Sequence, residues 1–220
     1  MNLLKAIEER HSVRSYTDRP IEGETLDRLQ KLVDNANKAS GLHIQLVLNE
    51  PKAFDSKMAH YGKFSGVKNY IALIGKRDKD LDEKCGYYGE SIVIGAQMLG
   101  LNTCWVALTY KKIPDAFTVE NDEKLLMVIA IGYGIDSGRA HSGKFYDEVT
   151  SDKDSPQWFK SGVEAALLAP TAMNQQKFSF TLKDGKVLAK AKFGACSKTD
   201  LGIVKYHFEI GSGKDSDIWL

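Results

Sequence analysis

Residues 125–133 read LLMVIAIGY, and within them Leu125–Ile131 is the longest uninterrupted apolar run in the 220-residue chain. A run of this length, flanked by charged residues and by glycine, predicts a strand that is buried on both faces of a sheet. It is far shorter than the ~20 apolar residues that cross a bilayer, so no membrane-spanning helix is expected. The sequence therefore predicts a protein built around one central strand.

Shorter elements surround this strand. Residues 43–49 and 70–75 predict two further strands, and the apolar spacing over 25–40, ended by Gly41, predicts an amphipathic helix. Residues 90–99 (ESIVIGAQML) are apolar nearly all round, which predicts a buried helix ended by Gly100. Asn2 is a good N-cap for a short N-terminal helix.

The C-terminal part predicts a helix over 158–168 and a final helix over 200–210, with a hairpin between them. The hairpin strands are 178–182 and 187–193, and the Asp184-Gly185 pair at the turn is the strongest short-range hairpin signal. Helices and strands are interspersed along the chain. The expected fold class is therefore α+β, with a mixed, largely antiparallel sheet flanked by helices.

Charge and cysteine usage exclude several classes of protein. Thirty Lys and Arg residues against 29 Asp and Glu give a net charge of +1, so a nucleic-acid partner is not expected. Three separated cysteines form no CxxC pair, and the histidines lack metal-ligand spacing, so neither a disulfide framework nor a metal site is expected. Charges interrupt the N-terminal apolar positions before a signal-peptide core forms. We expect a cytoplasmic protein with no membrane partner.

The second part of the chain looks like a shortened, weak copy of the first. Residues 39–45 end one helix and enter a strand, as residues 169–176 do later, and residues 89–100 resemble residues 199–211 in apolar placement. This similarity predicts an internal repeat, or pseudo-dimer, with parts at 1–150 and 151–220.

The first candidate binding element is Arg10-His11-Ser12-Val13-Arg14, which follows the short helix and enters an extended segment. Side chains alternate in extended chain, so Arg10, Ser12 and Arg14 are expected on one side. Two guanidiniums and a hydroxyl suit an elongated anionic ligand, since arginine can grip a phosphate with two parallel hydrogen bonds. Taken alone, the same residues also fit a solvated basic edge paired with neighbouring glutamates.

The second candidate element is Pro170-Thr171-Ala172-Met173-Asn174-Gln175-Gln176. Pro170 ends a helix, and the small residues after it allow close approach of a ligand to the backbone. Asn174 and Gln176 supply amides that both donate and accept hydrogen bonds. By itself this stretch also fits a polar helix-to-strand turn.

Together these elements resemble the nitroreductase family of flavin mononucleotide (FMN) oxidoreductases. The family opens with R-x-S-x-R, here Arg10, Ser12 and Arg14, and carries P-[ST]-x-x-N-x-Q, here Pro170, Thr171, Asn174 and Gln176. It also carries G-L-x-T-x-W, here residues 100–105. In ordinary members the P-[ST]-x-x-N-x-Q element follows the second helix and FMN lies between two subunits. Here the intact copy lies in the C-terminal part, which resembles a subfamily whose degenerate second half replaces the partner.

The resemblance implies a nitroreductase-like fold and a tightly bound FMN. Arg10 and Ser12 would hold the phosphate, helped by Arg139 or, by preference, Lys144, and Arg14 would lie near the pyrimidine edge of the flavin. The expected cofactor-binding set is completed by His11, Trp105, Pro170, Thr171, Ala172, Asn174 and Gln176.

The implied reaction passes two electrons from NAD(P)H through FMN to a small acceptor, such as a nitroaromatic or a quinone, with no protein nucleophile. A flavin-binding protein for storage or sensing, without turnover, is the alternative, and a scaffold without a cofactor is a third. A monomeric pseudo-dimer is the expected assembly, with a conventional homodimer as its competitor.

Overall fold

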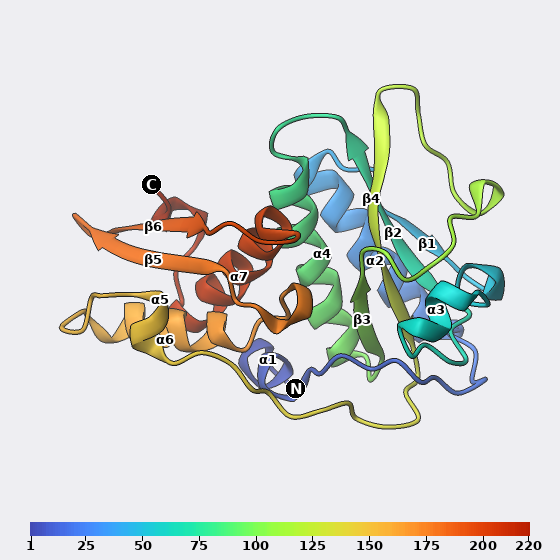
Figure 1. The fold of residues 1–220 in the computed structure, drawn as a ribbon, viewed down its shortest axis with the longest axis horizontal. Helices are drawn as coiled ribbons and strands as arrows, with labels where there is room; N and C mark the ends of the chain where they lie inside the picture. Colours follow the sequence, from blue (N-terminus) through green and yellow to red (C-terminus); the bar gives the residue numbers. More distant parts are fainter. The chain divides into compact units, whose positions relative to one another are not determined.

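The computed structural model describes residues 1–220, which form two compact units (Figure 1). The sheet unit contains Arg10–Leu81 and Ser91–Ala140, and the hairpin unit contains Met1–Glu9, Asp82–Glu90 and His141–Leu220. Helix α4 (Leu81–Met98) contributes residues to both units. The units thus interleave along the chain instead of meeting at residue 150, and the division at 150 as a repeat boundary stays a prediction.

Four antiparallel strands form the sheet unit's sheet, in the order β1-β2-β4-β3 (Figure 1). They are β1 (Gln45–Val47), β2 (Tyr70–Lys76), β3 (Asn102–Val106) and β4 (Glu123–Gly132). β4 pairs with β2 on one side and β3 on the other, which confirms the central strand predicted from residues 125–133. Strand β3 was not predicted, because its five residues (NTCWV) neither alternate between polar and apolar nor form a long apolar run.

The helices of this unit follow the sequence pattern. Helix α2 (Gly23–Ser40) buries Leu29, Val33 and Ala36 and ends at Gly41, which adopts φ 70° and donates its N–H to the carbonyl of Asn37. Short helical segments η1 (Pro51–Ala53), α3 (Lys57–Tyr61) and η2 (Pro114–Ala116) complete the unit. The helix predicted over 90–99 begins earlier, at Leu81. Its first turns carry charged residues, so the apolar pattern of residues 90–99 does not extend over them.

One hydrophobic cluster of the sheet unit joins the first candidate element to the sheet. Val13 and Tyr16 are buried together with Phe54, Phe64 and Tyr70. The rings of Phe54 and Phe64 meet edge-on with centroids 5.1 Å apart. Residues 10–16 are therefore anchored by packing as well as by backbone contacts.

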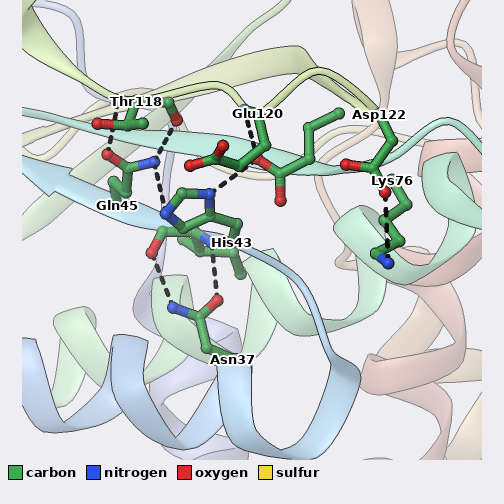
Figure 2. Close-up of polar contacts among 9 residues, drawn as sticks. Asn37, His43, Gln45, Lys76, Thr118, Glu120 and Asp122 are labelled. Atoms are coloured by element: carbon green, nitrogen blue, oxygen red, sulfur yellow. Dashed lines mark hydrogen bonds and ion pairs between the residues drawn. The ribbon is translucent and has the colours of Figure 1, made fainter.

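A polar network ties the chain before β4 to the first strand (Figure 2). Nδ1 of His43 lies 2.8 Å from Oε2 of Glu123, and Gln45 pairs with Thr118 through two hydrogen bonds of 2.7 and 2.9 Å. Asn37 of α2 brackets the backbone of Ile44 with hydrogen bonds of 2.7 and 2.8 Å. These contacts fix β1 against both α2 and the 118–123 segment.

The hairpin unit is mainly helical. Its helices are α1 (Leu3–Glu9), α5 (Tyr146–Val149), α6 (Gln157–Leu167), η3 (Ala172–Asn174), α7 (Ser197–Ser212) and η4 (Ser216–Ile218). Strands β5 (Phe178–Lys183) and β6 (Lys186–Ala191) form the predicted hairpin. Asp184 and Gly185 have φ values of 50° and 76°, as a tight hairpin turn requires.

Helices α6 and α7 enclose the core of the hairpin unit. Phe159 and Phe208 are fully buried with ring centroids 5.7 Å apart, and Gly162 lies so close to Phe208 that a Cβ would come within 2.8 Å of its ring. His207 and Glu90 have side chains with no exposed surface, and His207 Nε2 lies 2.9 Å from Glu90 Oε1. This buried pair links α7 to α4.

The predicted fold class is confirmed: the chain is α+β, with antiparallel strand pairs, flanking helices and isolated parallel bridges that add mixed character. The internal repeat stays a prediction. None of the helices combines the length and the apolar character that a bilayer crossing requires.

Candidate functional site

Residues 10–16 form an extended segment of the sheet unit, held alongside β3. Ser12 bridges Thr103 in the parallel sense, and the Val13 N–H donates to the Thr103 carbonyl at 3.0 Å. The hydroxyl of Tyr16, which is buried, donates to the carbonyl of Val13 at 2.8 Å. The segment predicted to enter an extended conformation therefore does so, in a fixed register against the sheet.

The loop that follows β4 packs on this segment at Gly138. Gly138 has φ 76°, and a Cβ there would lie 2.8 Å from the Cβ of His11 and 2.9 Å from the carbonyl oxygen of Ser12. Nδ1 of His11 is 3.0 Å from the carbonyl oxygen of Ser137. Only glycine fits this close approach, so His11 and Ser12 are covered by the 137–138 backbone.

Three residues of the predicted set act on the pKa of the Cys104 thiol. Burial raises the pKa of that thiol, while the charge of Arg14, a hydrogen bond with Ser12 and the charge of Arg10 all act in the opposite direction. Arg10 is only 4% exposed, whereas Arg14 is exposed and its guanidinium carbon lies 5.9 Å from the Phe64 ring centroid. The 10–14 segment thus carries one buried cation, one exposed cation and a hydroxyl, which are residue types that anion-binding sites use.

Trp105 lies on β3 directly after Cys104, half-buried and opposite Ile129 of β4. Its position on a strand of the sheet beside the 10–16 segment is compatible with the predicted role at a ring pocket. Arg139 is exposed at the end of the 134–140 loop. Their contacts with a cofactor stay predictions.

The second candidate element forms a strained loop in the hairpin unit, which we call the 170–176 loop. Met173, Asn174 and Gln176 have φ values of 53°, 53° and 45°. Left-handed backbone costs roughly 1–2 kcal/mol for each residue other than glycine. Such strain persists only where surrounding contacts hold it, and it often occurs at functional sites.

Part of that support comes from Gln176, which is 1% exposed. Its Nε2 donates to the Leu167 carbonyl at 2.7 Å, and its Oε1 accepts from the Lys144 N–H at 2.6 Å. Its backbone carbonyl accepts from Nζ of Lys144 at 2.9 Å. The amide of Gln176 is thus engaged on both atoms by the chain itself, and it holds the loop in place.

The stretch before Lys144 also lies along this loop. Nδ2 of Asn174 donates to the Ser142 carbonyl at 2.6 Å, and a Cβ on Gly143 would come within 2.6 Å of Gln176 Oε1. The structure therefore brings Lys144, the basic residue preferred from the sequence as the second phosphate ligand, to the 170–176 loop. These bonds leave the Oδ1 atom of Asn174 unused. The Thr171 hydroxyl oxygen accepts from the Gln176 N–H at 3.1 Å, which leaves its proton for donation.

Asp200, in the first turn of α7, also contacts the loop, and sequence reasoning missed it. The Ala172 N–H donates to both carboxylate oxygens, at 3.0 and 3.2 Å. Burial raises the pKa of Asp200 to about 6, against the hydrogen bonds from Ala172 and Gln175. No signal in the sequence separates this residue from any acidic residue that favours a helix N-terminus.

Comparison with known proteins agrees with this architecture. The family model described as "Putative TM nitroreductase" matches residues 2–212. The structure of a putative nitroreductase from Thermotoga maritima is similar with a TM-score of 0.70 and 22% identity, covering 96% of this chain and 83% of that one. No curated protein sequence matches.

Two further structures share the fold over a smaller part of the chain. A putative nitroreductase in complex with FMN, from Desulfovibrio desulfuricans, has a TM-score of 0.55 at 19% identity over 71% of this chain and 99% of that one. A putative NADH dehydrogenase/NAD(P)H nitroreductase from Bacteroides thetaiotaomicron has a TM-score of 0.51 at 19% identity over 68% and 96%. With its sheet, its arginine-bearing segment and a family match over nearly the whole length, this chain belongs to the nitroreductase family represented by that model.

Proposed function

We propose that this chain is an FMN-dependent oxidoreductase that passes two electrons from NAD(P)H to a small acceptor such as a nitroaromatic or a quinone. The observation that carries the proposal is the segment with buried Arg10, Ser12 and Arg14, which is held in register against Thr103 of β3 and carries the residue types of an anion site. The choice of cofactor is supported by the neighbour from Desulfovibrio desulfuricans, which is in complex with FMN. The choice of electron donor is supported by the neighbour from Bacteroides thetaiotaomicron, which is named as an NAD(P)H nitroreductase.

The phosphate end of FMN fits the buried part of this donor set. Arg10 is held almost fully out of solvent, where a charge-assisted hydrogen bond is stronger than at the surface. Ser12, two residues further along the same extended segment, adds a hydroxyl that can donate to a phosphate oxygen. We assign phosphate binding to Arg10 and Ser12, with Lys144 as the additional cation.

Arg14 is placed in a different environment, exposed and beside the Phe64 ring. We propose that it lies at the pyrimidine edge of the flavin. FMN, when bound, supplies the two-electron chemistry, and negative charge accumulates at that edge on reduction. A fixed guanidinium there stabilises the reduced state without itself exchanging a proton.

The 170–176 loop supplies the other side of the proposed site. Thr171 retains a hydroxyl proton for donation and Asn174 retains an amide oxygen, while Pro170 and Ala172 present small surfaces to a flat ring. Gln176 acts by holding the loop and Lys144 together. Trp105 is assigned to closure of the ring pocket.

We further propose that both elements come from the same chain, so that one monomer, as a pseudo-dimer, binds one FMN. The support is the order of the motifs: R-x-S-x-R at residues 10–14 and the intact P-[ST]-x-x-N-x-Q at residues 170–176 both lie in this chain.

The visible spectrum of the purified protein tests the proposal. Flavin absorption bands, bleached by NADH or NADPH without oxygen and restored by an acceptor, are the expected result. Flavin bands without bleaching support the alternative of a storage or sensing protein. A colourless protein that does not take up added FMN contradicts the proposal.

A further inference from the structure

The Asp200 carboxylate lies at a point where two elements of the hairpin unit meet. It belongs to the first turn of α7, is 3% exposed, and accepts the Ala172 N–H on both oxygens. Gln175, which acts to lower the pKa of this carboxylate, donates its Nε2 to the Ala195 carbonyl at 2.5 Å. The carboxylate therefore binds the 170–176 loop through the backbone of Ala172.

That loop needs external support to keep its conformation. Three of its residues have left-handed backbone, and Met173, which is 83% exposed, has no packing of its own to hold it. Gln176 secures the C-terminal end of the loop through Leu167 and Lys144. Asp200 is the corresponding contact in the middle of the loop, at the start of η3.

The carboxylate is kept there at a cost in stability. Burial raises the pKa of Asp200 to about 6, so the loss of hydration outweighs the hydrogen bonds from Ala172 and Gln175. The other titratable groups in this region, Cys196 and Asp82, supply no positive charge, and both Asp82 and Asp200 raise the pKa of the Cys196 thiol. A buried charge without a cation, bonded to a strained loop, is typical of a residue retained for function.

We propose that Asp200 is a positioning residue of the flavin site, which fixes the Ala172 backbone so that the loop presents Thr171 and Asn174 to FMN. This inference rests on the proposed function. Asp200 itself faces the loop backbone and is not expected to contact FMN.

Three variants test this role. Asp200→Ala removes both acceptor oxygens, and Asp200→Asn keeps the shape and one acceptor oxygen but removes the charge. Thr199→Val is the matched control, because Thr199 is the adjacent residue, is 1% exposed, and has a hydroxyl with no hydrogen-bond partner. The measurements are the dissociation constant of FMN, from quenching of flavin fluorescence, and the exchange rate of the Ala172 amide proton in the FMN-free protein.

Asp200→Ala is expected to weaken FMN binding about tenfold or more, because a bond to a charged group is lost. Asp200→Asn is expected to weaken it less, and Thr199→Val not at all. The Ala172 amide should exchange faster in Asp200→Ala. At pH 7, Asp200→Asn should unfold at the same or a higher urea concentration than the wild type, because a buried charge is removed. If Asp200 had only a structural role, this variant would unfold at a lower urea concentration.

The possible failures are distinguishable. A wild-type chain that does not bind FMN contradicts the proposed function, and the inference falls with it. If the wild type binds FMN and both Asp200 variants bind it equally well, the inference alone is overturned. Should Asp200→Ala not fold, Asp200→Asn decides: unchanged FMN affinity, or weaker affinity matched by an equal loss of stability, overturns the positioning role.

Discussion

Lys144 is joined to Gln176 twice, through its backbone N–H to Oε1 at 2.6 Å and through Nζ to the backbone carbonyl at 2.9 Å. Gln176 in turn reaches the Leu167 carbonyl. The end of α6, the 142–144 stretch and the 170–176 loop therefore meet at one buried amide, which couples the stability of this region to the geometry of the proposed site.

Gln176→Leu is expected to destabilise the protein by roughly 2–4 kcal/mol. The substitution removes the partner of the Lys144 N–H and of the Leu167 carbonyl, both in half-buried residues, and an unsatisfied group costs up to about 1–3 kcal/mol. Urea unfolding followed by circular dichroism measures the change. Gln30→Leu, at an exposed position where the side chain bonds only Asp34, is the control and should change the unfolding free energy little.

Arg10→Ala is expected to weaken FMN binding by about 1.5–3 kcal/mol, which is roughly 10- to 150-fold. The reason is loss of a charge-assisted contact to phosphate from a buried guanidinium. Equilibrium titration of the FMN-free protein measures the affinity. Arg28→Ala, which removes an exposed arginine of α2 paired with Glu24, should bind FMN as the wild type does. Unchanged affinity in a folded Arg10→Ala protein removes Arg10 from the phosphate site.

Arg14→Ala is expected to lower the flavin midpoint potential more than it weakens FMN binding. Its guanidinium is exposed beside Phe64, so it contributes less to holding the phosphate and more to stabilising charge on the reduced ring. A potentiometric titration monitored by absorbance measures the shift. Arg14→Lys, which keeps the charge, is expected to retain most of the wild-type potential. An unmoved midpoint in Arg14→Ala contradicts the placement at the pyrimidine edge.

Glu123 predicts a pH-dependent contribution to stability. Burial acts to raise the pKa of Glu123. Hydrogen bonds from His43 and the Glu120 N–H, together with the charge of His43, lower it by more, so the pKa is lowered overall. Because the pKa of Glu123 is lower in the folded state than its ordinary value of 4.5, the ionised carboxylate stabilises the folded protein at pH values above 4.5. This stabilisation is lost as the pH falls through the folded-state pKa. Compared with the wild type, Glu123→Gln should lose less stability on acidification in urea-unfolding experiments across the acidic range. Equal acid sensitivity of the two proteins contradicts this assignment.

Mixing two defective chains tests whether the proposed site lies within one chain. Arg10→Ala and Asn174→Ala proteins are each expected to bind FMN weakly, and to remain weak binders when combined, because an intramolecular site cannot be complemented. The expected stoichiometry is one FMN per chain, and the wild type should bind FMN at concentrations where it is monomeric in sedimentation experiments. Recovery of tight binding on mixing shows instead that the site is shared between two chains.

The sequence predicted the elements whose signals are local. The apolar run of β4, the Gly41 helix end and the Asp184-Gly185 turn each follow from residues within a few positions. Strand β3 was missed because its five residues are too few to show a strand pattern, and its extended conformation is set by pairing with β4.

In the candidate site, too, residues with a local signal could be predicted, whereas residues that depend on tertiary contacts could not. Arg10, Ser12 and Arg14 could be grouped from their alternation in extended chain, and all three act to lower the pKa of the Cys104 thiol. Asp200 could not be found, because its partner Ala172 lies 28 residues away and no local pattern links them. The engagement of the Gln176 amide by Leu167 and Lys144 likewise depends on tertiary contacts.

The interleaving of the two units has a consequence for biosynthesis. All residues of the sheet unit lie between positions 10 and 140, so this unit can leave the ribosome complete while the hairpin unit still lacks residues 141–220. Helix α1 precedes the sheet unit in the sequence, but it packs against α7, which follows that unit. Because domains fold as units during synthesis, the nascent sheet unit is expected to form before α1 docks on α7. A C-terminally truncated chain would thus expose α1 and the first turns of α4 to chaperones and proteases.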